Sequence, residues 1–505
     1  MTQAASMQKL ETGIPGFDLI AEGGLPARRA TLIAGTAGSA KTVFATQFLI
    51  AGINEENEAG VFVTFEDSPE DIRKNMAGFG WEIGNWEAKG KWAFVDAAPE
   101  PDSESATLLV GQYDLGALLA RIEYAVQKVD AKRVSLDSLN ALFVKYPDRA
   151  ILRAELFRIV ASLKKLGVTV VFTGERDDDY GATTRFGIEE FVADNAVILR
   201  NVLINERRRR TVEILKFRGA PHQRGEYPFT ITNGEGIIVI PLSGIELTQS
   251  SSTVRIPSGI PELDELAGGG FFRDSIILLS GATGTGKTLM TTQFLAGGIA
   301  AGERCLLFAF EESREQLFRN AAAWGVDFEG MERDKKLKVV NQYPHAMALE
   351  DTFVQMRATI EEFKPNRVAV DSLSSLERVS SVRAFREFVM SLTSFLKREE
   401  TAGLFTSTTE SLMGGGSVTE KHISTLTDTI ILLRYVEAYG EMRRGITVLK
   451  MRGSQHAHDI REYVIDSQGM HIKEPFRHVS GILSGQTSLA PWAADIGGGP
   501  SAAES

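Results

Sequence analysis

The sequence predicts an α/β fold built from two tandem domains, each a mostly parallel sheet flanked by helices. Two observations carry this prediction. Short apolar runs such as 30–34, 60–65, 133–136 and 168–173 alternate with helical patterns, which is typical of parallel strands joined by crossover helices. A unit of about 240 residues is also repeated, and this period is too long for a solenoid and suits a whole domain.

The repeat shows in five short motifs that recur in the same order. They are TGIPGFD (12–18) with SGIPELD (258–264), GTAGSAKT (35–42) with GATGTGKT (281–288), VTFED (63–67) with FAFEE (308–312), VSLDSL (134–139) with VAVDSL (368–373), and LKFRG (215–219) with LKMRG (449–453). We therefore expect a first domain at 1–240, a Ser/Thr-rich linker at 241–257 and a second domain at 258–483. The Gly- and Ala-rich stretch 484–505 is expected to be a flexible tail.

Each unit is expected to end in a strand pair. In the first unit, apolar runs at 196–203 and 210–216 flank the polar stretch 205–209, and in the second unit 429–435 and 445–450 flank 439–444. The arginine run Arg207–Arg210 could suggest a nucleic-acid patch. Because Glu206 precedes it, we expect the run to cap the first hairpin and to serve a subunit interface.

The second phosphate loop is the strongest motif in the chain. GATGTGKT at 281–288 fits G-x-x-x-x-G-K-[ST], follows an apolar run predicted to be a strand at 275–280, and precedes a predicted helix at 289–301. In such a loop, backbone N–H groups surround phosphate oxygens. Lys287 is expected to reach the β- and γ-phosphates and Thr288 to ligate Mg²⁺.

The first phosphate loop keeps Lys41 and Thr42 but departs from the motif at Ala40, where a glycine is usual. Alanine is tolerable there if its φ is negative. We still expect both loops to bind a nucleoside triphosphate. The expected contact residues are Thr36, Gly38, Ser39, Ala40, Lys41, Thr42 and Val43 in the first loop, and Thr283, Gly284, Thr285, Gly286, Lys287, Thr288 and Leu289 in the second.

An aspartate ends an apolar run downstream of each phosphate loop. Asp137 and Asp371 are both followed by serine, which is the Walker B arrangement that places a carboxylate near the Mg²⁺ shell. An aspartate at a strand end is often only a turn residue. Its recurrence in both units favours the functional interpretation.

Paired carboxylates mark a second position in each unit. Glu66 and Asp67 follow one predicted strand, and Glu311 and Glu312 follow its counterpart. Since successive strand residues face opposite sides, one carboxylate of each pair is expected to face the γ-phosphate. There it could polarise an attacking water or hydroxyl, although a single pair could equally be a solvated strand end.

A cationic strand closes each unit. Lys216 and Arg218, like Lys450 and Arg452, alternate with a bulky residue, which puts both cations on one face of a strand. Such a face could contact a nucleotide held by a neighbouring subunit, as an arginine finger does, or it could be only a solvated face. For the nearby His456, His458 and Asp459 we expect no metal site, because no further ligands are evident.

The two units differ most at KHISTLTD, residues 421–428. When Asp428 is aligned with Asp194, Ser424 and Thr425 stand opposite Glu190 and Phe191. Only the second unit therefore offers hydroxyl groups at this position. Hydroxyl pairs are usually inert, but beside an intact phosphate loop this pair suggests phosphate acceptors confined to one half of the chain.

Bulk properties narrow the function classes. A formal net charge of −11 over 505 residues argues against a dedicated nucleic-acid binder, so a DNA motor is the alternative and not the leading hypothesis. A nucleotide-gated scaffold is a third hypothesis. A single cysteine, no long apolar run and no signal-peptide core suit a cytoplasmic protein without a membrane segment.

Taken together, these motifs resemble the KaiC family, RecA-superfamily ATPases of bacterial clock systems. The resemblance covers about residues 10–485, and it is most specific at HISTLTDTIILL (422–433) and at RRRRT (207–211). It implies two RecA-like P-loop NTPase domains in a two-tiered homohexamer, with ATP and Mg²⁺ between subunits. It also implies ATP hydrolysis in the first tier and reversible phosphorylation of Ser424 and Thr425 in the second.

The resemblance also implies roles for individual residues. Glu66 would activate water in the first tier, and Glu311, beside Glu312, would be a general base or a carboxylate near the metal in the second. Residues reaching a neighbour's nucleotide would be Lys216, Phe217, Arg218 and His222 in the first tier, and Arg444, Lys450, Met451, Arg452, Gly453, Ser454 and His456 in the second. Trp324 would lie near the second-tier adenine.

Three departures from the family pattern affect these expectations. Ala40 and Asp67 weaken the case for strong catalysis in the first tier. The stretch after 484 lacks the charged segment through which cyanobacterial members bind their activator KaiA, so we expect weak or absent dependence on KaiA. A KaiB-like partner for the first tier is compatible with the resemblance, and no specific nucleic acid is expected.

Overall fold

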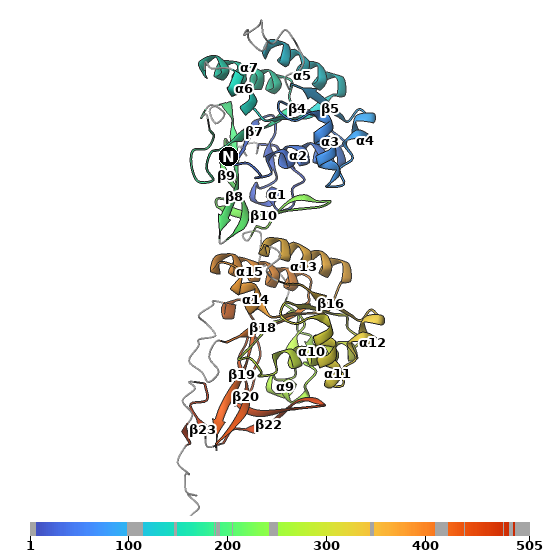
Figure 1. Cartoon of the computed structure of the whole chain (residues 1–505), viewed down its shortest axis with the longest axis vertical. Coiled ribbons are helices and arrows are strands. Elements are labelled where there is room, and N and C mark those ends of the chain that lie inside the picture. Colours follow the sequence, from blue (N-terminus) through green and yellow to red (C-terminus); the bar gives the residue numbers. More distant parts are fainter. Residues whose placement is uncertain are drawn as a thin grey trace, which may run out of the picture. The chain divides into compact units, whose positions relative to one another are not determined.

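A computed structural model of the chain describes residues 7–97, 115–145, 149–185, 187, 192–204, 206–241, 251–343, 348–409, 423–438, 440–477, 479–483 and 488–489. The chain forms two compact units, Met1–Ile245 and Glu246–Ser505. In each unit helices lie on both faces of a large sheet (Figure 1). The predicted α/β class with two mostly parallel sheets is therefore confirmed.

The first unit contains β1 (Lys9–Leu10), α1 (Phe17–Ile20), β2 (Leu25–Pro26), β3 (Ala30–Gly35), α2 (Lys41–Glu55), β4 (Ala59–Thr64), α3 (Pro69–Ala77), α4 (Ile83–Ala88), β5 (Trp92–Asp96), α5 (Leu115–Val129), β6 (Ala131–Asp137), α6 (Asn140–Lys145), α7 (Arg149–Lys165), β7 (Thr169–Glu175), β8 (Asn195–Ile204), β9 (Arg207–Phe217), β10 (Glu226–Thr232) and β11 (Gly236–Val239).

The second unit repeats this order. It contains β12 (Arg255–Ile256), α9 (Pro261–Leu266), β13 (Phe271–Phe272), β14 (Ile276–Gly281), α10 (Lys287–Ala300), β15 (Cys305–Ala309), α11 (Arg314–Ala323), α12 (Phe328–Arg333), β16 (Leu337–Asn341), α13 (Leu349–Phe363), β17 (Arg367–Asp371), α14 (Leu373–Arg378), α15 (Val382–Arg398), β18 (Ala402–Thr408), the 3₁₀ helix η4 (Ile423–Thr425), β19 (Thr429–Ala438), β20 (Glu441–Met451), β21 (Arg461–Asp466), β22 (Gly469–Pro475), β23 (Val479–Ser480) and β24 (Ser488–Leu489).

The two large sheets have the same topology. The strand order is β11-β10-β9-β8-β3-β7-β6-β4-β5 in the first unit and β16-β15-β17-β18-β14-β19-β20-β21-β22 in the second. In the first unit, the neighbouring strands β5, β4, β6, β7, β3 and β8 pair in parallel. The neighbouring strands β8, β9, β10 and β11 pair antiparallel. Because the phosphate-loop strand β3 or β14 is central and parallel, its carboxyl end meets the carboxyl ends of its neighbours at one sheet edge.

The large sheet of the first unit has an apolar core on each of its two faces. Successive strand residues point to opposite sides, so β3 places Leu32 in one core and Ile33 in the other. Helices α5 and α7 cover the face of Leu32, and α1, α2 and α3 cover the face of Ile33 (Figure 1). The near-continuous burial of β3, β4 and β6 follows from this double cover.

A buried arginine ties each phosphate-loop helix to the sheet. Arg133 on β6 is 1% exposed, and it donates hydrogen bonds to the carbonyl oxygen of Phe48 on α2 at 3.0 Å and to Glu58 at 3.0 Å. Arg367 on β17 makes the equivalent bond to Phe294 O on α10 at 2.9 Å. The helix that follows each phosphate loop is thereby fixed to the strand that carries the Walker B aspartate.

The terminal hairpins differ from the prediction in length. Strand β9 begins at Arg207 and pairs with β8 up to Ile204, so Arg207–Arg210 lies within a strand and does not cap the hairpin. Glu206 has a φ of 66°, in the left-handed region that suits a tight strand-to-strand turn. The polar composition of this stretch was misleading because a cross-strand ladder can include arginines, three of which are half-buried here and one of which, Arg208, is exposed.

Candidate nucleotide sites

The two phosphate loops share one backbone shape. Gly286 has φ 89° and ψ 25°, and Ala40 has φ 74° and ψ 28°. The condition of a negative φ at Ala40 is therefore not met: the alanine occupies the same left-handed position as the glycine. The position is left-handed because the loop must turn into the first turn of α2 or α10, and an alanine there costs about 1 kcal/mol or more.

The lysine of each loop lies against the loop backbone. Lys41 Nζ donates hydrogen bonds to Gly35 O and Thr36 O, both at 3.0 Å, and Lys287 Nζ bonds the matching oxygens of Gly281 and Ala282 at 2.9 and 3.0 Å. Burial lowers the pKa of both lysines, although nearby carboxylates oppose this. Each ammonium group is thus partly dehydrated and next to the loop that is to receive phosphate.

The loop threonine and the Walker B aspartate form a second matched pair. Thr42 Oγ1 donates to Asp137 Oδ2 at 2.7 Å, and Thr288 Oγ1 donates to Asp371 Oδ2 at 2.8 Å. Burial raises the pKa of both aspartates, and hydrogen bonds from threonines partly offset this. A hydroxyl and a carboxylate at this distance are a donor set that fits Mg²⁺, which prefers few protein oxygens together with substrate phosphates.

The acidic pairs lie just beyond their strands. Strand β4 ends at Thr64 and β15 ends at Ala309, so alternation along a strand does not decide which carboxylate faces the loop. In the first unit Glu66 makes the inward contact, where it accepts a hydrogen bond from Ser138 Oγ at 3.3 Å. Burial raises the pKa of Glu66. The backbone oxygen of Asp67 accepts a hydrogen bond from Thr64 Oγ1 at 2.6 Å.

In the second unit Glu311 accepts three hydrogen bonds from side chains of the described residues. Its Oε1 accepts hydrogen bonds from Ser372 Oγ and Ser375 Oγ at 2.7 Å and from Arg378 at 2.8 Å. Burial alone would raise its pKa, but these donors together lower the pKa below its usual value. Glu312 instead accepts one bond from Asn320 at 3.2 Å, and burial raises its pKa.

The cationic strands have the predicted alternation. Phe217 and Met451 are buried in the cores, and the flanking cations lie on the other face. Lys216 Nζ donates to Ala193 O at 3.3 Å. Lys450 Nζ donates to the carbonyl oxygens of both Ser424 and Thr427, at 2.8 and 2.7 Å. Sequence reasoning missed this contact, because a backbone carbonyl leaves no mark in a sequence.

The hydroxyl pair of the second unit lies on the short helix η4. Ser424 is buried, with 6% of its surface exposed, whereas Thr425 is exposed. Arg452 donates to Thr425 O at 2.8 Å, so Lys450 and Arg452 together hold the backbone of the turn. The matching positions of the first unit, Glu190 and Phe191, lie outside the described residues.

The remaining predicted contact residues are scattered around the two sites. His222 packs beside Phe217 with ring centroids 5.3 Å apart, and Trp324 is the C-cap of α11 and packs against the core. Arg444 lies over Tyr435, whose hydroxyl donates to Thr283 O of the second phosphate loop at 3.4 Å. His456 Nε2 and Arg444 Nε are buried and have no hydrogen-bond partner among the described residues.

Sequence reasoning also missed a hydrogen bond that links the first phosphate loop to Asp179. Thr36 Oγ1 donates to Asp179 Oδ1 at 2.9 Å, and Asn201 N donates to the same oxygen at 3.0 Å. The second loop has Ala282 in place of Thr36 and cannot form this contact. The doublet of Asp177 and Asp178 preceding Asp179 was the available signal.

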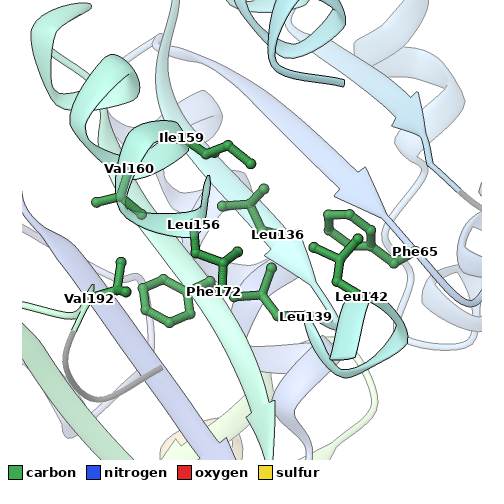
Figure 2. A pocket seen from close by; sticks show the side chains of 9 residues that line it. All are labelled: Phe65, Leu136, Leu139, Leu142, Leu156, Ile159, Val160, Phe172 and Val192. Atoms are coloured by element: carbon green, nitrogen blue, oxygen red, sulfur yellow. The ribbon is translucent and has the colours of Figure 1, made fainter. Parts of the chain in front are cut away.

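An apolar cavity lies behind the first site (Figure 2). Its lining includes Phe65 and Leu136, which immediately precede Glu66 and Asp137. Every lining residue is apolar: Phe65, Leu136, Leu139, Leu142, Leu156, Ile159, Val160, Phe172 and Val192. With no polar group to orient a ligand, the cavity is part of the core that backs the two carboxylates.

Phosphate loop, Walker B aspartate and parallel sheet define both units as P-loop ATPase domains of the RecA-like type. Comparison with known sequences then identifies the family. The family profile described as "ATPase: KaiC" matches residues 10–244 and 256–476. The chain therefore belongs to the KaiC family of ATPases, and a DNA motor is not favoured.

Named relatives agree with this assignment. The chain is 64% identical to the circadian clock protein KaiC3 of Synechocystis, with 95% of this chain and 94% of the relative aligned. It is 55% identical to the circadian clock oscillator protein KaiC of Thermostichus vulcanus and 54% identical to that of Synechococcus elongatus, each over 95% of this chain and 92% of the relative. Among the described residues, no helix is long and apolar enough to cross a membrane.

Proposed function

We propose that this protein is an ATP-dependent timing protein whose second domain phosphorylates its own Ser424 and Thr425 and later removes the phosphate. The observation that carries the proposal is the placement of η4. Ser424 and Thr425 lie on the η4 turn, and Lys450 and Arg452 bind its backbone. The aligned first-domain residues, Glu190 and Phe191, carry no hydroxyl. The relatives' names support the timing role, since they are circadian clock proteins.

The residues of each site would share the work as follows. ATP would lie on the phosphate loop, and Mg²⁺ would be held by Thr42 with Asp137 in the first domain and by Thr288 with Asp371 in the second. When bound, Mg-ATP supplies the γ-phosphoryl group. Lys41 and Lys287 neutralise the charge on the phosphates, and their dehydrated positions strengthen this effect.

The carboxylates would accept the proton of the attacking group. In the first domain Glu66 would orient and deprotonate water, which gives hydrolysis. In the second domain Glu311, close to the metal, would accept the proton of an acceptor hydroxyl, with Glu312 beside it. We assign hydrolysis to residues 1–240 and phosphoryl transfer to residues 258–483.

The acceptors and the cations of one chain would act on the nucleotide of its neighbour. This requires a ring, and we propose the two-tiered homohexamer that the family resemblance implies. Lys216, Arg218 and His222 would complete the first-tier site, and Arg444, Lys450, Arg452 and His456 the second-tier site. A KaiB-like protein remains our candidate partner for the first tier, and the cytoplasm our expected location.

Removal of the acceptors tests the proposal. The full chain and its Ser424→Ala, Thr425→Ala double variant are incubated with radiolabelled Mg-ATP, and protein-bound and free phosphate are counted separately. We expect the double variant to lose protein-bound phosphate and to keep both phosphate release and hexamer assembly, because the first site is untouched. Persistent labelling of the double variant would refute the acceptor assignment.

A further inference from the structure

The cluster around Glu311 contains more than a general base requires. Helix α14 and its N-cap bring three donors to one oxygen, Glu311 Oε1: Ser372, Ser375 and Arg378. They are spaced three residues apart, so they lie on one face of the helix turn. Arg378 also bonds the carbonyl oxygen of Ser374 at 3.3 Å, which keeps its guanidinium close to the helix.

The equivalent helix of the first domain lacks two of these donor residues in its sequence. Among the residues that the structure describes, Glu66 accepts a hydrogen bond from Ser138 at 3.3 Å. The residues aligned with Ser375 and Arg378 are Ala141 and Val144, which carry no donor. The two domains therefore share the serine that follows the Walker B aspartate and differ three and six residues further along the helix.

We propose that Ser375 and Arg378 restrain Glu311 within its own domain and so slow phosphoryl transfer at the second site. This inference rests on the proposed function of Glu311. In the step concerned, the acceptor hydroxyl oxygen bonds to the γ-phosphorus, the bond from that phosphorus to the β,γ-bridging oxygen breaks, ADP leaves, and the hydroxyl proton passes to a carboxylate. A carboxylate oxygen already holding three donors, one of them charged, is a poor acceptor for that proton.

Arg378 is well placed to be released. Its side chain is 69% exposed, so the ion pair with Glu311 is solvated and contributes little to folding. An anionic group from outside the helix could compete for the guanidinium without unfolding the core. Arg378 is therefore a positioning residue that acts through Glu311.

The test compares Arg378→Gln with Arg383→Gln in the full chain. Arg383 has the same side-chain exposure of 69% and pairs with Glu387 on its own helix, so it is a matched control. Both variants and their parent carry Glu66→Gln, which removes the proposed first-site base. Total ATP consumption, counted as protein-bound plus free phosphate, then reports the second site and is measured against ATP concentration. We expect Arg378→Gln to raise kcat for the second site about two- to fivefold with KM unchanged, and Arg383→Gln to change neither.

Further variants separate restraint from general damage. Ser375→Ala is expected to act in the same direction with a smaller gain, and Arg378→Lys to restore most of the wild-type rate. An unchanged or lower kcat in Arg378→Gln at an unaltered melting temperature would overturn the proposal. If the wild type forms no protein-bound phosphate, the autokinase assignment fails, while total ATP consumption still reports whether the restraint exists.

Discussion

The two domains present the same phosphate loop to two different surroundings. Ala40 and Gly286 take the same left-handed conformation, and the two Thr–Asp pairs match to within 0.1 Å, at 2.7 and 2.8 Å. The difference lies opposite the loop. Within the part of the chain that the structure describes, Glu66 has one serine donor, and Glu311 has three donors including an arginine.

The two domains therefore share the residues expected to bind nucleotide. They differ in the residues expected to receive the phosphoryl group or to activate the attacking group. Opposite the loop, the second domain has the hydroxyls of Ser424 and Thr425 on η4 and two donor residues to Glu311, Ser375 and Arg378, that the first domain lacks. Under our proposals, the hydroxyls would receive the phosphoryl group and the two donors would slow its transfer. A fast hydrolase needs neither feature, whereas a slow self-modifying enzyme would use both.

The largest expected effect separates the two loop lysines. Lys287→Ala should lower phosphoprotein formation by about 100-fold or more, because it removes the charge that stabilises the transferring phosphoryl group. Lys41→Ala should mainly reduce assembly and phosphate release. Labelling with radioactive Mg-ATP, followed by size-exclusion chromatography, measures both. If both variants assembled normally and lost labelling equally, the assignment of phosphoryl transfer to the second domain alone would be contradicted.

The next effect distinguishes the two acceptors. Thr425 is exposed and Ser424 is 6% exposed, so a γ-phosphate can approach the threonine without opening the turn. Thr425→Ala should reduce the initial rate of labelling about tenfold, and Ser424→Ala should leave that rate nearly unchanged. The measurement is the initial rate of labelling of each variant, starting from unphosphorylated protein. A larger early loss in Ser424→Ala would show that the turn opens before transfer.

A smaller effect is expected from Lys216 and Lys450, which bind backbone carbonyl oxygens just before β8 and β19. Lys450→Gln loses two hydrogen bonds to the η4 turn, at about 1 kcal/mol each, and should lower the labelling rate severalfold by misplacing the acceptors. The matched variant, Lys216→Gln, breaks a longer bond to Ala193 and should leave labelling unaffected. Partial recovery in Lys450→Arg would indicate positioning. Similar losses at both lysines would contradict the specific role of the second.

The smallest effects concern the backbone of the loops. Ala40→Gly should stabilise the first domain by about 1 kcal/mol, since glycine takes a positive φ without strain. Gly286→Ala should destabilise the second domain by about 1–3 kcal/mol, because its Cβ would also meet Ile465 Cδ1 at 2.8 Å. Scanning calorimetry without nucleotide gives both values. Destabilisation by Ala40→Gly would mean that the alanine methyl packs favourably enough to outweigh its strain.

Much of the site could be read from the sequence. Lys287, Thr288 and Asp371 belong to motifs whose spacing already implies a strand, a loop and a helix, and the structure places them together. The parallel sheets also followed from alternating apolar runs. Motifs of this kind are informative because their chemistry depends on side chains at fixed positions.

Other features could not be read in this way. The φ of Ala40 is set by the path of the whole loop, and the partners of Lys450 are backbone carbonyls that any sequence would offer. The strand extension to Arg207 depends on a cross-strand ladder. The restraint on Glu311 was accessible in principle, since Ser372, Ser375 and Arg378 follow the Walker B aspartate at helical spacing.

The most direct test of the division between the domains is a map of phosphate along the chain. The full-length protein is incubated with Mg-ATP and analysed by tandem mass spectrometry with peptides covering both domains. We predict phosphate on Ser424 and Thr425 and none on the hydroxyls of residues 1–240. Phosphate on first-domain hydroxyls, or its absence from both Ser424 and Thr425 while ATP is being consumed, would contradict the assignment of self-modification to the second domain alone.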